Sequence, residues 1–427
     1  MSNSATLPVM SHADSSTELI IERQVHGGLG LGRLPDGRVV LLRGGIPGER
    51  VVATLASRKG VLVGEVSQVL DASPDRVPAP VHPGLDLAHV AYPRQLELKR
   101  EVLADALARA TGEQIAVPEV VAAPEQWSYR SAVQPAVSAG ALGYREPGSN
   151  EVVPLEHDPS ANEAVNSAWR TLTELGLAIP QAAIREVAIR GNSGGEALIA
   201  LIAKGQESAA LDLGHRLVER GVAGVAWAPY DPRGRFRGGS RKLTGKRTIL
   251  QRYGEHEFSV TATSFSQPNP AAAALLYRDL VALAGSGERA VELFAGGGAI
   301  AMHLAAGFAG VTAIEVDKGA VERGKRDAER LGITNVDLLR SDARRLELER
   351  GPELYVVDPP RAGLPAELRA QLAEAVSGRL VYVSCDVATW ARDVVDLRAR
   401  GLRLRHFQAY DFYPQTHHIE VLSLFER

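Results

Sequence analysis

Strands and helices alternate through the C-terminal part of the chain, from about residue 258 onward. Five short apolar runs cover residues 290–294, 311–315, 336–339, 354–357 and 380–383. Helical stretches of about 12 residues or more separate most of them. Strands joined by helices form parallel β-α-β units, with helices on both faces of one sheet. The sequence therefore predicts an α/β fold with a Rossmann-like, doubly wound domain over residues 259–427.

The first three strands of this domain each end in residues suited to a nucleoside. The first runs into a glycine turn that contains Gly296 and Gly298, and Glu315 ends the second strand. That spacing from the turn is typical of an acid that binds a ribose diol, and Asp342 follows the third strand, where an adenine amine would lie. Each acid alone could be a helix cap. Together they indicate a nucleoside site, and the lack of a basic anchor for a pyrophosphate favours S-adenosylmethionine over a dinucleotide.

The fourth strand ends in Asp358-Pro359-Pro360-Arg361. The prolines fix the loop, so we expect Asp358 to face the methyl group of the cofactor. Enzymes that methylate an exocyclic amine often carry an aromatic residue after such a Pro-Pro pair, where Arg361 stands here. The sequence therefore favours a target atom other than an amine.

The fifth strand ends at Cys385, the only cysteine of the chain. A lone cysteine excludes an internal disulfide and a multi-cysteine metal site, and it is often just a small buried apolar residue. Its place at the mouth of a strand instead predicts a nucleophile. The tail carries His417, His418 and Glu420; because adjacent histidines on a strand point to opposite faces and no third ligand follows, we expect no metal.

A cysteine, an acid and a methyl donor fit one reaction. Carbon-5 of uracil is too weak a nucleophile until a thiolate adds to carbon-6. After methylation, a base must remove the carbon-5 proton so that the thiolate can leave. Cys385 is the predicted nucleophile and Glu420 the predicted base, and the target base must leave its stack to reach them.

The N-terminal part predicts a small all-β module. Residues 1–16 form an expected disordered lead without a signal peptide, which predicts a cytoplasmic protein. Residues 17–75 show closely spaced short strands and glycine turns, typical of a five-stranded OB-like barrel with a mild basic excess. The net charge is −3, so any nucleic-acid binding must use local patches. No apolar run reaches the length of a membrane span.

Residues 76–258 predict a central α+β domain. A proline-rich linker over 73–83 precedes an amphipathic helix over 95–111, which Gly112 ends. Residues 231–247 form the most basic window of the chain. This window is either a solvated hairpin or an arm that contacts phosphates.

Four motifs resemble the RNA (uracil-5-)-methyltransferase family, whose members place a TRAM barrel and a central domain before the catalytic domain. They are Phe265-Ser266-Gln267-Pro268-Asn269, the Asp358-Pro-Pro-Arg-x-Gly loop, Ser384-Cys385-Asp386, and the tail from Asp411 to Glu420. The resemblance covers the chain from about residue 18. It implies that Cys385 is the nucleophile and Glu420 the proton acceptor. It places Gln267, Phe294, Glu315, Asp342 and Asp358 at cofactor-binding positions.

Two departures from the family pattern stand out. Ala299 replaces a polar residue of many members, so one cofactor contact should be missing. Many members also hold an iron–sulfur cluster with cysteines after the barrel. The matching positions here are Arg76, His82, Leu85 and Asp158. We therefore expect no cluster, and a segment held by ordinary packing.

The predicted activity is formation of 5-methyluridine in RNA, with S-adenosylmethionine as cofactor and a monomer as the acting form. The barrel favours 23S ribosomal RNA over transfer RNA. A cytosine-5 RNA methyltransferase would use the same thiolate chemistry, but no second cysteine stands near Asp358. A non-catalytic RNA-binding or assembly factor would need neither Cys385 nor Glu420. A small-molecule methyltransferase would not need the barrel.

Overall fold

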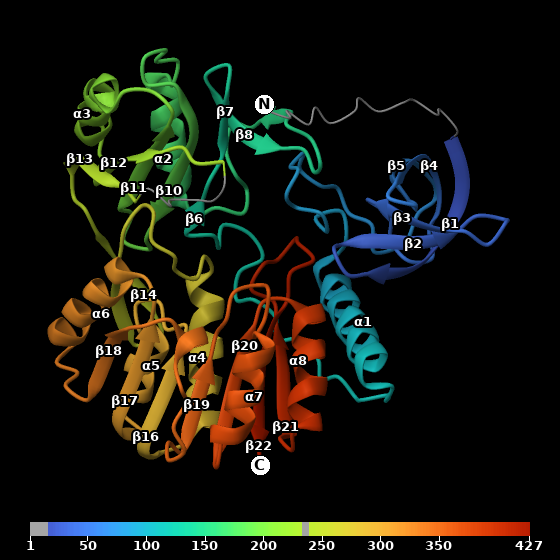
Figure 1. Cartoon of the computed structure of the whole chain (residues 1–427). Helices are drawn as coiled ribbons and strands as arrows, with labels where there is room; N and C mark the ends of the chain where they lie inside the picture. Colours follow the sequence, from blue (N-terminus) through green and yellow to red (C-terminus); the bar gives the residue numbers. More distant parts are fainter. Residues whose placement is uncertain (1–15, 233–238) are drawn as a thin grey trace, which may run out of the picture.

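The computed structural model describes residues 16–232 and 239–427 (Figure 1). The lead up to residue 15 and residues 233–238 of the basic window lie outside the described residues. Figure 1 shows three parts, a barrel, a central domain and a C-terminal layered domain, whose loops converge above the carboxyl edge of the C-terminal sheet.

Five strands close the N-terminal barrel in the order β1-β2-β3-β5-β4, as the sequence predicts. They are β1 (Ser16–Val25), β2 (Leu29–Arg33), β3 (Val39–Arg43), β4 (Arg50–Arg58) and β5 (Val61–Asp71). The barrel thus begins at the last residue of the expected lead. Glycines occur within β2 because β1 leaves no room for side chains there. A Cβ on Gly32 would stand 2.3 Å from Leu19 Cδ1.

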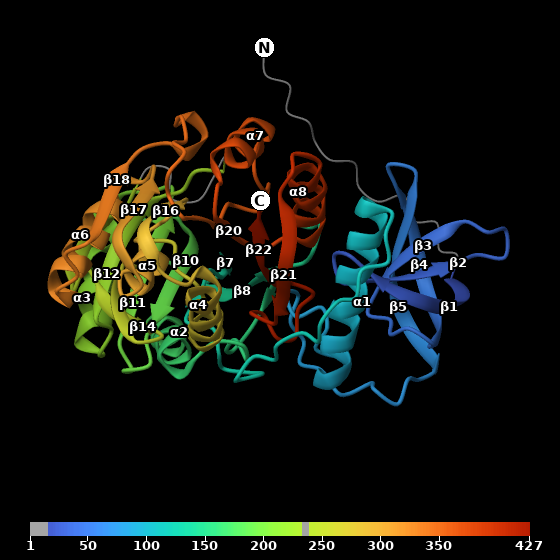
Figure 2. The same ribbon diagram turned by 90° about the horizontal axis from the view of Figure 1, so that it is seen from below.

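A long helix, α1 (Tyr92–Thr111), follows the linker and ends at Gly112 in a left-handed conformation. It begins three residues before the predicted start, because Pro93 is accommodated in its first turn. Figure 2 shows α1 between the barrel and the C-terminal domain, where it contacts β1 on one side and α8 (Val387–Ala399) on the other.

The central domain is one sheet of order β13-β12-β11-β10-β7-β8-β9, with β6 paired to β10. Its strands are β6 (Ala132–Val133), β7 (Ala136–Ser138), β8 (Ala141–Arg145), β9 (Val152–Pro154), β10 (Ile184–Gly191), β11 (Ala197–Ala203), β12 (Gly224–Pro229) and β13 (Arg241–Gly245); its helices are α2 (Glu163–Leu175), η1 (Glu207–Ala210) and α3 (Leu211–Glu219). The described end of the basic window is therefore an edge strand, β13, antiparallel to β12.

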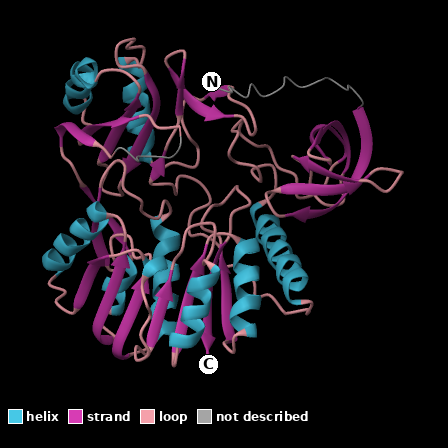
Figure 3. Cartoon of the chain, viewed as in Figure 1, coloured by secondary structure: helices cyan, strands magenta, loops and turns pink. Residues whose placement is uncertain are grey.

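The C-terminal sheet has the order β18-β17-β16-β19-β20-β22-β21, with helices on both faces (Figure 3). Its elements are β16 (Gly287–Leu293), α5 (Ala299–Leu304), β17 (Phe308–Glu315), α6 (Lys318–Leu331), β18 (Val336–Arg340), η2 (Ala343–Arg345), β19 (Leu354–Val357), α7 (Ala366–Ala375), β20 (Arg379–Ser384), α8, β21 (Arg403–Tyr410) and β22 (Glu420–Glu426). The five predicted strands are parallel, which confirms the predicted fold class, and β22 inserts antiparallel between β20 and β21.

A hairpin of β14 (Ile249–Tyr253) and β15 (His256–Val260) precedes α4 (Pro270–Ala284). It packs against α4 and α6, and Tyr253 and Phe258 join the core of the C-terminal domain. No helix in the described residues is both long and apolar enough to cross a membrane.

Candidate active site

Cys385 and Glu420 lie side by side at one end of two paired strands. Ser384 of β20 is opposite Val421 of β22 in antiparallel register, so the next position on each strand is Cys385 and Glu420. Glu420 is buried, with 3% of its surface exposed, and it begins the last strand. Cys385 is partly exposed and borders a small cavity of about 60 Å³. Asp358, which follows β19 beside β20, completes the group.

Burial and negative charge set the protonation of this group. Burial, and then the charges of Glu420 and Asp358, raise the pKa of the Cys385 thiol to about 12, while Arg361 opposes the rise. Burial raises the pKa of Asp358 to about 7. Burial and the charge of Asp358 raise the pKa of Glu420 well above its ordinary value. A carboxylate of raised pKa is a stronger base, which suits a group that must take a proton from carbon.

The glycine turn after β16 is open toward the edge of the sheet. Phe294 has a φ of +63°, and Gly296 and Gly298 also adopt positive φ values. A Cβ on Gly296 or Gly297 would meet nothing within 4 Å. Glu315 holds the turn, because its carboxylate accepts hydrogen bonds from the N–H of Gly296 at 2.9 Å and of Asp317 at 2.8 Å. The turn is thus shaped to receive a ligand at close range.

Asp342 stands at the expected strand end, but Arg344 occupies its carboxylate. The guanidinium donates to both oxygens at 2.8 and 2.7 Å. These hydrogen bonds, with that of the Arg344 N–H, hold the pKa of Asp342 at about 2. A carboxylate has about four acceptor sites, so one remains for an adenine amine. Gln267, the last of the predicted cofactor residues, is partly exposed, and its backbone carbonyl accepts a hydrogen bond from Tyr253.

Known proteins place this chain in a family. The model of the tRNA (uracil-5-)-methyltransferase family matches residues 248–350 and 352–427. An uncharacterized RNA methyltransferase of Gloeobacter violaceus is 31% identical over 94% of both chains. One from Streptomyces avermitilis is 31% identical, covering 96% of this chain and 98% of its own. The chain belongs to the RNA (uracil-5-)-methyltransferase family. The resemblance drawn from the four motifs is confirmed, and the protein is an RNA methyltransferase that uses S-adenosylmethionine.

The fold of this methyltransferase is shared with a solved enzyme. The tRNA (uracil-54, C5)-methyltransferase of Pyrococcus abyssi, solved in complex with S-adenosyl-L-homocysteine, is 24% identical with a TM-score of 0.78. The likeness covers 95% of this chain and 100% of the other. The open glycine turn and the carboxylates of Glu315 and Asp342 fit an S-adenosyl cofactor, whose ribose and adenine offer hydrogen-bond donors.

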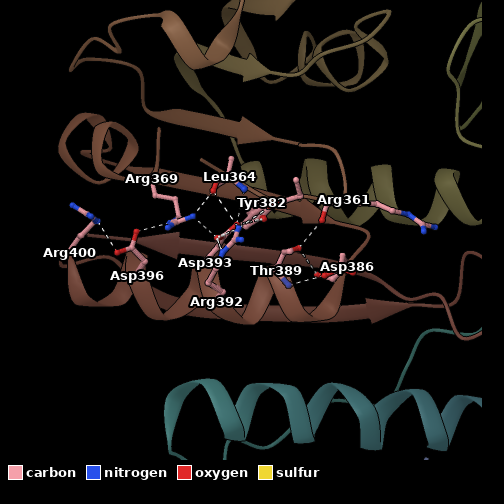
Figure 4. A network of polar contacts seen from close by, with 11 residues as sticks. Arg361, Leu364, Arg369, Tyr382, Asp386, Thr389, Arg392, Asp393, Asp396 and Arg400 are labelled. Carbon is pink, nitrogen blue, oxygen red and sulfur yellow. Dashed lines mark hydrogen bonds and ion pairs between the residues drawn. The ribbon is translucent and has the colours of Figure 1, made fainter. Parts of the chain in front are cut away.

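Helix α8 of the methyltransferase holds the loop that follows Asp358 through polar contacts to Arg361 and Leu364 (Figure 4). The buried carboxylate of Asp393 accepts hydrogen bonds from the Leu364 N–H at 2.9 Å and the Tyr382 hydroxyl at 2.8 Å. The Thr389 hydroxyl donates to the Arg361 carbonyl at 3.2 Å. The loops that carry Asp358 and Cys385 are thereby held against one helix.

The loop that leads to Glu420 is tied to α1 by buried polar contacts. Lys99 forms an ion pair of 2.7 Å with Asp411, and both side chains are almost wholly buried. Gln95 and Gln415 exchange two hydrogen bonds of 2.8 and 2.9 Å. The sequence alone did not indicate this role for α1. The available signal was that Lys99 lies on the same helical face as the apolar Leu103.

Arg76, His82 and Asp158, three of the four positions at which the resemblance implies cluster cysteines, take part in polar contacts here. Arg76 binds the buried Glu49 of the barrel through two hydrogen bonds of 2.6 Å. His82 lies 3.7 Å from Asp158, which also accepts hydrogen bonds from the hydroxyls of Tyr144 and Ser160, at 2.6 Å each. Polar contacts therefore hold the segment that follows the barrel, in addition to the expected packing. Within residues 16–232 and 239–427, no group of three or more metal-binding side chains comes together.

Proposed function

We propose that this methyltransferase forms 5-methyluridine in RNA, with Cys385 as nucleophile and Glu420 as general base. The observation that carries the proposal is the pairing of the two residues on neighbouring strands, beyond the Ser384–Val421 register pair. Uracil carbon-6 and carbon-5 are adjacent atoms, so an enzyme that attacks one and deprotonates the other needs two such neighbouring groups.

The proposed reaction assigns one task to each side chain. The Cys385 thiolate adds to carbon-6 and gives carbon-5 enolate character. Bound S-adenosylmethionine supplies an electrophilic methyl group. Glu420 then takes the carbon-5 proton, and elimination of the thiolate restores the aromatic ring. The Gly296 turn, Glu315 and Asp342 hold the cofactor.

Cys385 must lose its proton before it adds. Burial and the neighbouring carboxylates disfavour the thiolate, whereas the guanidinium of Arg361 favours it. A thiolate that forms from a thiol of high pKa is a strong nucleophile. The proposal therefore gives Arg361 the role of stabilising the thiolate.

As substrate we propose 23S ribosomal RNA, on the strength of the barrel beside the catalytic domain. Transfer RNA is the second candidate, because the matching family model and the solved Pyrococcus enzyme are named for it. We propose that the enzyme acts as a monomer, since one chain supplies the nucleophile, the base and the acids of the cofactor site.

The test uses the Glu420→Gln variant with S-adenosylmethionine and total RNA from cells that lack the enzyme. The variant should trap a protein–RNA adduct that survives denaturing electrophoresis, because the carbon-5 proton cannot leave. The adduct should vanish when Cys385→Ala is added. Mapping the trapped nucleotide names the RNA and distinguishes uridine from cytidine.

Glu347→Gln is the matched control, since Glu347 is exposed. That variant should methylate RNA as the wild type does and should leave no adduct. If Glu420→Gln leaves no adduct while the wild-type enzyme methylates RNA, the roles of Cys385 and Glu420 are wrong.

A further inference from the structure

The residues that line the Cys385 cavity include three histidines and an arginine. His417 and His418 come from the loop before β22, and Arg361 from the loop after β19. The third histidine, His26, comes from the barrel, more than 350 residues before Cys385 in the sequence. The small N-terminal module thus contributes a side chain to the catalytic cavity.

The turn between β1 and β2 packs closely against the residues around the Cys385 cavity. His26 Nε2 lies 3.7 Å from Asp386 Oδ2, and the His26 ring packs edge-on to that of His417 with centroids 6.3 Å apart. Gly28 lies so near that an added Cβ would stand 2.4 Å from Asp86 Oδ2 and 3.1 Å from His417 Cβ. About half of the His26 side chain, 52%, remains exposed at the mouth.

The acids of the rim are already engaged. Asp86 accepts the His417 N–H at 3.0 Å and contacts its ring Nδ1. Asp386 caps α8 by accepting the Thr389 N–H at 2.8 Å, and its other oxygen faces His26. Neither carboxylate pairs with Arg361.

Arg361 has no carboxylate within ion-pair distance in the part of the chain that the structure describes. Its Nη2 lies 3.2 Å from His418 Nε2. Burial, and then the charges of His417 and Arg361, lower the pKa of His418 to about 3, so that imidazole stays neutral. The cavity is therefore lined by a guanidinium that forms no ion pair in the described residues, and by the half-exposed His26 imidazole.

We propose that His26 and Arg361 bind a phosphate of the RNA backbone next to the target nucleotide. The inference rests on the proposed function. It places one phosphate of the RNA substrate between His26 and Arg361. Cys385 lines the same cavity as His26 and Arg361, so a base that reaches the thiol brings its own phosphates close to both side chains. Phosphate contacts of this kind fix the position of a nucleotide without reading its sequence. The barrel turn would then complete the catalytic site.

The lone cysteine provides a readout that needs no catalysis. Uridine, uridine 5′-monophosphate, uridine 3′-monophosphate and inorganic phosphate are each titrated against the rate of Cys385 modification by N-ethylmaleimide, followed by mass spectrometry. At least one monophosphate should protect Cys385 at an about tenfold lower concentration than uridine, because charge-assisted hydrogen bonds add to its affinity. Inorganic phosphate should protect weakly, since it lacks the base.

The preference for the monophosphate should fall to about twofold or less in His26→Gln and in Arg361→Gln. His215→Gln, which changes an exposed histidine of α3, should keep the full preference. Melting curves check that each variant is folded. Equal protection by uridine and both monophosphates, or an undiminished preference in His26→Gln, would overturn the inference.

These outcomes are independent of the proposed chemistry. If the wild-type preference and its loss in His26→Gln are found but no uridine is methylated, the phosphate site stands and the proposed function fails. If uridine is methylated but no preference for the monophosphate is found, the proposed function stands and the phosphate site fails.

Discussion

Cys385 and Glu420 stand opposite each other, one position beyond the last register pair of β20 and β22, which is Ser384 with Val421. The register therefore places the buried carboxylate of Glu420 next to the thiol. As a consequence, the negative charge of Glu420 opposes ionisation of the Cys385 thiol. Five measurable properties of the protein follow from this arrangement and from other contacts in the structure.

Alkylation of Cys385 should depend steeply on pH. Because burial, Glu420 and Asp358 raise the thiol pKa to about 12, the thiolate fraction at any lower pH is smaller than in an ordinary thiol. The iodoacetamide reaction of the free protein should rise about tenfold per pH unit between pH 7 and pH 10. Glutathione, measured alongside, should level off near pH 9. A plateau for Cys385 below pH 9 would contradict the charge arrangement.

Lys99→Met should destabilise the protein and weaken catalysis together. The substitution leaves the buried Asp411 carboxylate without its cation, which should lower the free energy of unfolding by about 3–5 kcal/mol. The loop that carries Glu420 loses an anchor at the same time. Urea denaturation and a methylation assay measure the two effects.

Lys325→Met, at an exposed position of α6, is the control and should change the stability by less than about 0.5 kcal/mol. Adding Asp411→Leu to Lys99→Met should recover part of the stability, since no buried charge then remains unpaired. A Lys99→Met protein as stable as the control would show that the ion pair is dispensable.

Local sequence patterns predict most of the catalytic domain. The five parallel strands follow from apolar runs, and Cys385, Glu315 and Asp358 fall at their ends because a strand must stop where the chain turns polar. Glycine turns likewise predict the barrel. These patterns do not predict strand β2, because two of its five residues are glycines, which have a low β-propensity. Its glycines instead make room for the side chains of β1.

Long-range polar pairs are the part that the sequence does not predict. The partner of Lys99 lies 312 residues away, and nothing in an amphipathic helix identifies a lysine that will be buried with a carboxylate. Asp342 presents the same difficulty. The sequence predicts that Asp342 ends a strand. It does not predict that Arg344, an ordinary residue for a polar loop, binds the Asp342 carboxylate.

Glu315→Ala should weaken binding of the cofactor. The substitution removes the acceptor for the N–H groups of Gly296 and Asp317, so the glycine turn loses its support as well as its acid. The Kd for S-adenosyl-L-homocysteine, measured by calorimetry, should rise about tenfold or more. Glu322→Ala, within the neighbouring helix α6, should bind as the wild type does. Equal affinities for the two variants would remove Glu315 from the cofactor site.

Asp158→Asn should lower stability at neutral pH and matter less in acid. Burial opposes the charge of Asp158, but the nearby His82 and hydrogen bonds from Ser160 and Tyr144 outweigh it and hold the pKa well below its usual range. Stability from a depressed pKa is present above the unfolded value of about 3.9 and is lost as the pH falls toward the folded value. The variant should lose about 1–3 kcal/mol at pH 7. The difference from the wild type should shrink below about pH 4, and a constant difference down to pH 2.5 would contradict this.

Gly28→Ala should separate the barrel turn from the catalytic cavity, and Gly27→Ala provides a matched control. Both glycines have positive φ values, +74° and +88°, so both substitutions carry the same backbone strain. A Cβ on Gly27 meets nothing within 4 Å, whereas one on Gly28 would collide with Asp86 and His417. Both variants should show a small fall in the melting temperature from the backbone strain, and the collision should add to it in Gly28→Ala alone. Only Gly28→Ala should lower kcat/KM for RNA, by about tenfold, because it alone displaces His26 and the loop before Glu420. If the two variants methylate RNA equally well, the seating of the barrel turn does not contribute to the reaction.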